Sequence, residues 1–473
     1  MRIPENGLSR SEVLDRLEAY RQHDLDWQGG RVFAYVYDPG EDVRSVVKTA
    51  YGMYLSENGL DPTTTPSVLQ MEREVVRAII NLQRGDENVV GNMTSGGTES
   101  IMLAVKAARD YARATRGISE PAIVLSNTTH AAFHKAAAYL GLDVTVVPCD
   151  PDTLDVDIEG YRAAITENTV LLVVSAPNYS HGIIEDVPAV AALAAEHDLL
   201  CHVDACVGGI MLAYMRDDYD FPAYDWTVPG VTSISTDLHK YGYAAKGASV
   251  IMYRSKALRR SMIWASAATT GYPIINPTVQ STRSGGPKAG AWAALNYLGD
   301  EGYRKLTRDV MEATRRIREG IDAIAELTIL GDPGMCLLAF SSDALNVYQL
   351  ADAMKKRGWY IQPQFSNGPI PRNVHITVQH SSAPHVDEFL AALRASVEDV
   401  KALPPIDEDQ INAMLQPVIE DFTPERFSQL TAFVGMDGGS LPEDLALINT
   451  ILDLLPAPMA EQFLIEFFNE LYV

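Results

Sequence analysis

The chain has 473 residues, of which 47% are hydrophobic and 21% are charged, a composition typical of a soluble protein with two or three domains. Its formal net charge of −24 argues against binding to nucleic acid or to an anionic membrane through a general basic surface. Any phosphate group must therefore be held locally, by backbone N–H groups and a few selected cations.

The cysteine content and the N-terminal residues favour a reducing compartment, the cytoplasm. No Cys-x-x-Cys pair occurs among the four cysteines, so neither a zinc site nor a disulfide framework is indicated. Residues 1–20 are polar with the pattern of an amphipathic helix, without the apolar core of a signal peptide. No uninterrupted apolar run is long enough to span a bilayer. We expect a cytoplasmic protein without a membrane anchor or targeting signal.

From about residue 88, short β-branched runs alternate with helical patterns. Strands are expected at residues 88–95, 121–126, 143–149, 169–177, 199–206, 231–237 and 248–254. Helices are expected between several of them, at 98–115, 131–141 and 186–198. Runs that are apolar on both faces and separated by helices predict an α/β fold, with a mostly parallel central sheet buried between helical layers.

The later part of the chain has a different pattern. A helix is expected at 309–327, followed by short strands near 336–340 and 373–380, which together indicate a smaller α+β domain. From residue 403 the chain is acidic and helical, with two apolar stripes joined at Pro456 and Pro458, and we expect these helices to pack on the body or on a second subunit. The expected division is an N-terminal segment 1–60, a large cofactor-binding domain 61–305, a small domain 306–402 and a helical tail 403–473.

Ligands of parallel sheets bind beyond the carboxyl ends of the strands, so the residues that follow each strand carry the functional argument. After the first strand, Gly96-Gly97-Thr98-Glu99 opens a helix. Its glycines let the backbone wrap around an anion, Thr98 can cap the helix, and the free N–H groups favour a phosphate. The spacing is that of neither a P-loop nor a dinucleotide fingerprint. On its own, a plain strand-to-helix turn explains this stretch equally well.

Two further groups follow the second and fifth strands. His130 opens a helix, with His134 one turn later, and no third ligand for a metal is evident. His130 is either an ordinary cap or surface residue or a ring that stacks on a flat cofactor. Asp204 follows an apolar strand and is either a helix cap or the partner of a protonated ring nitrogen.

The stretch after the sixth strand contains Asp237, His239 and Lys240, with Lys246 six positions further on. A lysine beside a histidine and a second cation should have a lowered pKa, which makes its amine a nucleophile towards an aldehyde. Surface residues could show the same pattern by chance. Together, however, a phosphate cradle, a stacking ring, an acid and a reactive lysine at one sheet edge are the four contacts that pyridoxal 5′-phosphate needs.

These residues also carry a family resemblance, in the segments TSGGTESIMLAVKAARD, HAAFHKAA, HVDACVGG, GVTSISTDLHKYGYAAKGAS and NPTVQSTRSGG. They resemble the sphingosine-1-phosphate lyases, fold-type-I pyridoxal-phosphate enzymes in the branch shared with the group II amino-acid decarboxylases. The likeness runs from about residue 30 to about residue 400. It implies retro-aldol cleavage of the C2–C3 bond of a phosphorylated sphingoid base, which gives a long-chain aldehyde and phosphoethanolamine.

The resemblance also implies roles around the cofactor. Lys240 would carry it as an imine, Asp204 would pair with its ring nitrogen, and His130 would stack on its ring. The cofactor phosphate would be held by Gly97, Thr98 and His239. In the lyases a Gly-Ser-Arg turn reaches this phosphate from the neighbouring subunit. The matching residues here are Ser281, Thr282 and Arg283, so Thr282 keeps the hydroxyl, and an obligate homodimer with shared active sites is implied.

On the substrate side, Lys246 matches a second lyase lysine near the substrate. Lys246, Tyr54 and Tyr243 are candidates for the proton transfers. The lyase stretch Asn-Pro-Leu-His-Pro is matched by Asn58, Leu60 and Pro62 of Asn-Gly-Leu-Asp-Pro. Gly59 and Asp61 depart from it, and Asp61 removes a possible cation from the place where a substrate phosphate would sit.

Two other functions compete with the lyase. An amino-acid decarboxylase on the same scaffold would need a cation for the substrate carboxylate, and Arg283 or Arg372 could supply one. Release of carbon dioxide instead of a long-chain aldehyde would identify it. A non-catalytic cofactor-binding or scaffolding protein is the third possibility, and an absorbance spectrum would separate it from the two enzymes.

Overall fold

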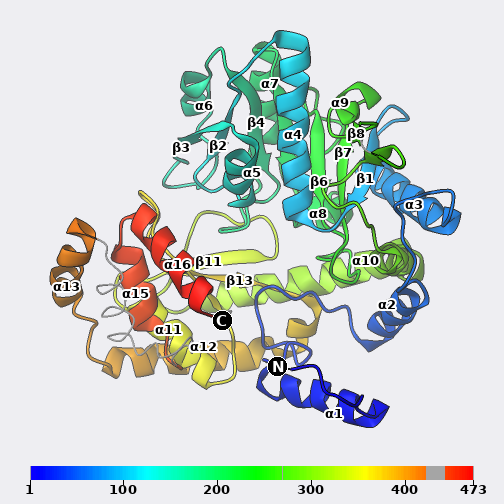
Figure 1. Ribbon diagram of the computed structural model, residues 1–473. Coiled ribbons are helices and arrows are strands. Elements are labelled where there is room, and N and C mark those ends of the chain that lie inside the picture. Colours follow the sequence, from blue (N-terminus) through cyan, green and yellow to red (C-terminus); the bar gives the residue numbers. More distant parts are fainter. Residues whose placement is uncertain (1, 269, 422–442, 472–473) are drawn as a thin grey trace.

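A long helix connects the two main parts of the chain (Figure 1). The computed structural model describes residues 2–268, 270–421 and 443–471. Above this helix in Figure 1 lies a large α/β unit, and below and to its left lie a smaller α+β unit and the C-terminal helices. Within the described residues, no helix is long and apolar enough to cross a bilayer.

The large unit is built on a seven-stranded sheet with the strand order β1-β7-β6-β5-β4-β2-β3. Its strands are β1 (Val90–Thr94), β2 (Ala122–Ser126), β3 (Asp143–Val147), β4 (Thr169–Ser175), β5 (Leu200–Asp204), β6 (Ser233–Thr236) and β7 (Ser249–Tyr253). Only β7 runs antiparallel to its neighbours β1 and β6, so the prediction of a mostly parallel sheet is confirmed. Each strand falls inside a run expected from the sequence.

Strand β4 shows why these runs are apolar throughout. Its residues Leu171 and Val173 belong to a cluster that includes helices on one face, and Leu172 and Val174 belong to the main core on the other face. Successive side chains of a strand point to opposite faces, so a strand covered on both sides, such as β4, is apolar on both faces. The covering helices are α4 (Gly97–Arg116), α5 (Ala132–Leu140), α6 (Ile158–Ala164), α7 (Val187–Glu196) and α8 (Gly208–Met215).

The connecting helix α10 (Gly285–Asp322) is longer than the helix expected at 309–327. Gly299, at φ 58°, interrupts it within its first half, and this left-handed conformation is one that glycine adopts without strain. Because Gly299 breaks the helical periodicity, the sequence pattern did not indicate the part of α10 before residue 309. The boundary expected between residues 305 and 306 lies inside α10.

The smaller unit has a four-stranded antiparallel sheet with the order β10-β11-β13-β12. Its elements are β10 (Thr328–Ile329), β11 (Leu337–Ser341), α11 (Val347–Lys356), β12 (Gln362–Gln364), β13 (Asn373–Thr377) and α12 (Val386–Ala402). The N-terminal segment completes its core. The backbone of Phe33 bonds to Tyr360 (2.9 Å) and Thr377 (2.7 Å), and its buried ring packs on Phe389.

The tail forms α13 (Glu408–Glu420), α15 (Ala446–Leu454) and α16 (Ala457–Leu471), with the break at Pro456 that the sequence predicts. Asp352 of α11 accepts hydrogen bonds from the backbone N–H groups of Leu445 (3.0 Å) and Ala446 (2.8 Å), which caps α15. The described part of the tail therefore packs on the smaller unit, as expected. The remaining elements are α1 (Arg10–Tyr20), η1 (Arg21–His23), α2 (Glu41–Met53), α3 (Pro66–Leu82), α9 (Lys256–Arg260), β8 (Trp264–Ser266), β9 (Ile274–Asn276) and η2 (His380–His385).

Candidate active site

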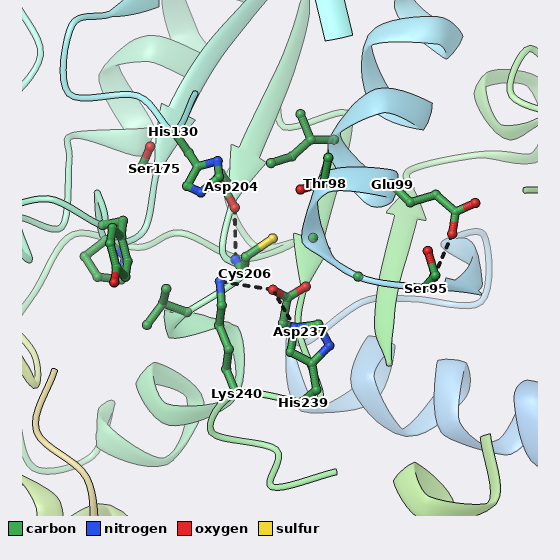
Figure 2. Close-up of a pocket in the computed structure, with 16 residues that line it drawn as sticks. Ser95, Thr98, Glu99, His130, Ser175, Asp204, Cys206, Asp237, His239 and Lys240 are labelled. Atoms are coloured by element: carbon green, nitrogen blue, oxygen red, sulfur yellow. Dashed lines mark hydrogen bonds and ion pairs between the residues drawn. The ribbon is translucent and has the colours of Figure 1, made fainter. Parts of the chain in front are cut away.

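A cavity of about 340 Å³ opens at the carboxyl edge of the central sheet (Figure 2). The segments that follow β1, β2, β4, β5 and β6 all reach it. This is where the topology of a parallel sheet places a ligand. The cavity brings together six residues singled out in the sequence, which are Gly97, Thr98, His130, Asp204, His239 and Lys240.

Lys240 extends into this cavity from the turn after β6, towards Asp237 (Figure 2). Its Nζ atom lies 3.0 Å from Oδ2 of the buried Asp237, which is also 3.6 Å from Nε2 of His239. Asp237 follows the last residue of β6, so the strand fixes the carboxylate and a turn over the next three residues brings the lysine back to it. A buried carboxylate thus holds the reactive nitrogen in place.

The expected lowering of the Lys240 pKa is wrong. Burial is the largest single influence and lowers the pKa of Lys240, but the Asp237 carboxylate, joined by Cys206, Tyr37 and Asp204, raises it by more in total, so the pKa lies above its ordinary value. The lysine with the lowered pKa is Lys246, where burial and repulsion by Lys240 reduce the pKa to about 8. Although the two lysines are only six residues apart, Lys240 holds its proton more strongly than an ordinary lysine and Lys246 holds it more weakly.

Lys246 lies beside the cavity, outside its lining. Its Nζ donates to the backbone oxygens of Tyr35 (2.9 Å) and His239 (3.3 Å) and lies 4.9 Å from the centre of the Tyr37 ring. Both acceptors are uncharged. The ammonium form therefore has no carboxylate partner within 4.0 Å among the described residues, which agrees with its lowered pKa.

Asp204 and His130 occupy the opposite side of the cavity from Lys240 (Figure 2). Oδ1 of Asp204 accepts hydrogen bonds from the Cys206 backbone N–H (3.0 Å, Figure 2) and from the Ser235 hydroxyl (3.2 Å). Oδ2 has no hydrogen-bond donor among the described residues and is available to a ligand. The Ala132 N–H donates to Nδ1 of His130 (3.1 Å), which fixes the ring. Desolvation lowers the His130 pKa, so the ring is neutral near pH 7.

The turn between β1 and α4 forms the end wall. A Cβ atom on Gly97 would lie 2.8 Å from Oδ2 of Asp237 and 3.0 Å from the Cys206 sulfur, so only glycine fits there. The expectation that Thr98 caps α4 is wrong, because the N-cap is Gly96 and Thr98 lies in the first turn. Glu99 instead accepts the Ser95 N–H (2.6 Å). The N–H groups of the first helical turn have no partner within the helix and face this end of the cavity.

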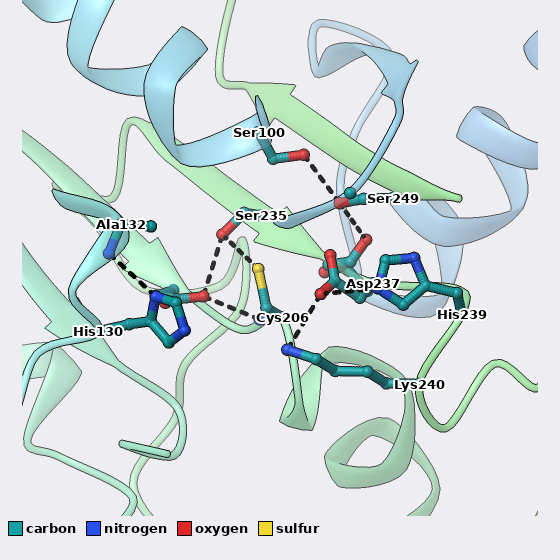
Figure 3. A network of polar contacts seen from close by, with 12 residues as sticks. Ser100, His130, Ala132, Cys206, Ser235, Asp237, His239, Lys240 and Ser249 are labelled. Carbon is teal, nitrogen blue, oxygen red and sulfur yellow. Dashed lines mark hydrogen bonds and ion pairs between the residues drawn. The ribbon is translucent and has the colours of Figure 1, made fainter. Parts of the chain in front are cut away.

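His239 lies at the same end, with its ring fixed by the protein. The Ala248 N–H donates to its Nδ1 (3.2 Å), which leaves Nε2 directed towards Asp237 (Figure 3). Burial lowers its pKa, while the Asp237 carboxylate opposes this in part. The ring can therefore donate a hydrogen bond without carrying a permanent charge.

Five other predicted residues lie elsewhere in this chain. Tyr54, Asn58, Thr282 and Arg283 are absent from the lining of the Lys240 cavity. Asn58 Oδ1 accepts the backbone N–H groups of Leu60 (2.9 Å) and Arg283 (3.1 Å), which makes it a loop-stabilising residue here. Tyr243, proposed for proton transfer, is buried and stacks on Tyr303, away from the cavity.

Arg372 is also distant from the cavity. It pairs with Glu408 (2.6 Å) and with the buried Asp453 (3.0 Å), and so it binds the tail to the smaller unit. Both contacts engage Arg372 within the chain, at the junction with the tail. Arg283 forms an ion pair with Glu72 (2.7 Å) and is likewise committed within the chain.

Two aromatic residues of the site gave no signal in the sequence. Tyr179 lines the cavity, and its ring packs between His130 (6.4 Å) and His375 (4.5 Å). Tyr37 lies near both lysines, and its pKa is raised by burial although Lys240 opposes the rise. Tyr37 belongs to the N-terminal segment, which is brought to the site only by the chain's path through the smaller unit.

The residues present fit pyridoxal 5′-phosphate. Asp204 offers a free carboxylate oxygen in a buried setting, and the glycine turn offers unpaired N–H groups that no side chain obstructs. His130 and Lys240 face the space between them. Asp204 thus suits the ring nitrogen of the cofactor, the glycine turn its phosphate, His130 its ring face and Lys240 its aldehyde.

Comparison with known proteins agrees with this geometry. Residues 22–343 match the family described as "Pyridoxal-dependent decarboxylase conserved domain", and residues 388–470 match "Pyridoxal-dependent enzyme, C-terminal putative HTH domain". The sphingosine-1-phosphate lyase of Oryza sativa subsp. japonica is 38% identical over 411 residues, which cover 85% of this chain and 75% of that protein. A probable L-aspartate decarboxylase of Pyrococcus abyssi is 30% identical over 394 residues, covering 83% and 98%.

Among solved structures, the sphingosine-1-phosphate lyase of Burkholderia pseudomallei superimposes with a TM-score of 0.81 at 35% identity, covering 89% of this chain and 97% of that one. The resemblance noted in the sequence is confirmed. The fold is that of the fold-type-I pyridoxal-phosphate enzymes.

Proposed function

The chain belongs to the pyridoxal-dependent decarboxylase family, and from this premise we propose that it is a sphingosine-1-phosphate lyase. The reaction is cleavage of the C2–C3 bond of a phosphorylated sphingoid base into a long-chain aldehyde and phosphoethanolamine. The observation that carries the proposal is the meeting of Lys240, Asp204 and His130 in one cavity, with a second lysine of lowered pKa beside it. The relatives with 35–38% identity over most of the chain support the substrate class.

The cofactor is pyridoxal 5′-phosphate, which supplies an electron sink conjugated to the substrate's Cα when it is bound. Lys240 is the residue that would hold it covalently. Asp204 would keep the ring nitrogen protonated, since its Oδ2 is a buried charge in need of a donor. The first turn of α4 and His239 would bind the phosphate.

Lys246 is the base that we assign to the C3 hydroxyl. A base must be unprotonated to accept the proton, and a pKa of about 8 gives Lys246 a substantial neutral fraction near neutral pH. Its hydrogen bonds to two backbone oxygens hold Nζ in position. Of the earlier candidates, Tyr243 is buried elsewhere and Tyr54 lies outside the cavity.

The decarboxylase alternative is supported by the Pyrococcus relative but less well by the cations of the site. It needs a cation free to bind the substrate carboxylate. Arg372 lies in the tail interface and Arg283 is paired with Glu72. Each of these two arginines is therefore already paired with a carboxylate of the chain, whereas a decarboxylase needs a cation free to bind the carboxylate of its substrate.

A homodimer with shared active sites is part of the proposal. Thr282 and Asn58 do not line the chain's own Lys240 cavity, as expected if they serve a partner's site. Helix α1 also exposes an apolar stripe, formed by Val13, Leu14 and Leu17, that a second subunit could cover.

The four free, buried cysteines are those of a protein from a reducing compartment, and we propose a cytoplasmic location. Nucleic acid is not among the proposed partners. Residues 403–473 hold 13 acidic residues and one basic residue, so the segment matched to a putative HTH domain would be repelled by phosphate backbones.

The proposed function is tested by incubating the holoenzyme with sphingosine 1-phosphate and quantifying long-chain aldehyde and phosphoethanolamine. A panel of amino acids with detection of carbon dioxide serves as the competing assay. Reduction with borohydride and peptide mapping should place the cofactor on Lys240, and Lys240→Ala should lose both the adduct and turnover. Carbon dioxide release without aldehyde would replace the lyase by a decarboxylase.

A further inference from the structure

A second cavity, of about 230 Å³, adjoins the cofactor cavity. The two share Ser95 and Glu99 in their walls, so only the β1–α4 turn separates them. Lys246 and Lys288 also line the second cavity, which we call the Lys288 cavity. Nothing in the reaction as described above uses Lys288.

Lys288 is an almost fully buried cation with weak partners. Its residue is 5% exposed. The shortest contacts of Nζ are the Ser284 backbone oxygen at 3.4 Å and Oε2 of Glu72 at 3.9 Å. An ammonium group carries three donors and is costly to bury without close acceptors.

Glu72 does not satisfy this charge. Its carboxylate receives two hydrogen bonds from Nη1 of Arg283 (2.7 and 3.0 Å) and one from the Met93 N–H (3.3 Å). Glu99, the carboxylate that lines the cavity, already accepts the N–H groups of Ser95, Val279 and Gln280. Both acids are thus engaged by other donors, so neither forms a close hydrogen bond with Lys288, although their charges still act on it from a distance.

The position of Lys288 in its helix also favours an anion beside it. It lies in the first turn of α10, which begins at Gly285 and has no acidic residue there. The N-terminus of a helix carries a partial positive charge, so a lysine is unfavourable at this place. The lysine and the helix terminus favour the same ligand, an anion.

The loop that departs from the lyase pattern lies close by. A Cβ atom on Gly59 would be 3.6 Å from Nζ of Lys288, so the glycine leaves room beside the lysine. Asp61, which replaces the expected histidine, accepts both the N–H (2.8 Å) and the hydroxyl (2.7 Å) of Thr63. It is exposed in its own turn and lines neither cavity. Asp61 replaces the histidine that could carry a positive charge in the lyase pattern, and Lys288 supplies a cation beside the same loop.

We propose that the Lys288 cavity binds the phosphate monoester of the substrate and that Lys288 is the residue that selects for this group. The inference rests on the proposed lyase function and names its specificity determinant. Lys288 holds the anion while Lys246, in the same cavity, is left to act as the base. Burial lowers the pKa of both lysines, and an anion beside Lys288 would stabilise the protonated form of that lysine.

The test measures binding of inorganic phosphate to the holoenzyme by isothermal titration calorimetry, in which the cofactor's own phosphate site is already filled. Lys288→Met should weaken phosphate binding roughly 30-fold, and Lys288→Arg should largely retain it. Lys305→Met is the matched control, because Lys305 lies on the same helix but is exposed and paired with Asp309. With sphingosine 1-phosphate, Lys288→Met should raise KM by a similar factor and change kcat little.

A structural role for Lys288 makes the opposite prediction for stability. If Lys288 mainly supports Glu72, Lys288→Met should unfold at a lower temperature and bind phosphate as the wild type does, which would overturn the inference. Under the inference, removal of a poorly paired buried charge leaves the melting temperature unchanged or higher while binding is lost. Wild-type phosphate binding that Lys288→Met abolishes, without any cleavage of sphingosine 1-phosphate, would support the anion site and refute the lyase function.

Discussion

Asp237→Asn should convert Lys240 from a group that stays protonated into one that titrates below the ordinary lysine range. The substitution keeps the shape of the side chain and removes its charge. At the observed separation of 3.0 Å, an effective dielectric constant of about 20 gives an attraction of about 5 kcal/mol, or about four pKa units. Burial, which lowers the pKa of Lys240 and is the largest single influence on it, remains in the variant. We therefore expect a value below the ordinary one of about 10.4.

The assay is competitive acetylation of the apoenzyme at a series of pH values, followed by mass mapping of the peptide that contains His239-Lys240. In the wild type, Lys240 should resist acetylation up to about pH 10, whereas in Asp237→Asn it should react at lower pH. The exposed Lys305, read from the same digest, should behave alike in both proteins. A Lys240 profile that is the same in both proteins would show that Asp237 does not set the charge of this nitrogen.

Three further predictions follow from the site and the tail. Asp204→Asn should reduce kcat on the order of 100-fold while the bound cofactor, measured by absorbance, stays near one per chain, because the carboxylate acts on the electronics of the ring. The value of kcat/KM should rise with pH through about 8, as Lys246 loses its proton, and in Lys246→Met this limb should disappear with a loss of roughly 100-fold or more. Arg372→Met should lower the free energy of unfolding by about 3 kcal/mol in urea denaturation, since it leaves the buried Asp453 without its cation, and it should leave KM unchanged.

The sheet and the cofactor edge could be predicted from the sequence because both depend on local information. The inner strands β2 and β4 and the strand β7 are apolar or β-branched runs that are buried throughout, and such runs are recognisable without knowledge of their partners. Since parallel strands end at one edge, the residues that follow them must converge. Gly97, His130, Asp204 and Lys240 were found in this way.

What the sequence could not provide depends on contacts between distant segments. Tyr37 reaches the site because Phe33 is fixed in the core of the smaller unit, more than 300 residues away in the chain. The role of Arg372 in the tail interface requires Asp453 to fold back on it. The helix expected at 309–327 was placed too late because Gly299 breaks the periodicity of α10. No window of neighbouring residues contains this information.

The charge states of the two lysines show the same limitation and also explain their spacing. Lys240 and Lys246 are six residues apart and share a cluster, yet the pKa of the first is raised and that of the second falls to about 8. The largest influence that raises the pKa of Lys240 is Asp237, which forms an ion pair with the first lysine but not with the second, and Cys206, Tyr37 and Asp204 add to it. A protonated Lys240 in turn repels a proton from Lys246 and so lowers its pKa further. Placing acid and base functions on neighbouring groups requires their pKa values to be separated, and here the buried Asp237 makes the largest contribution that raises the pKa of Lys240 above that of Lys246.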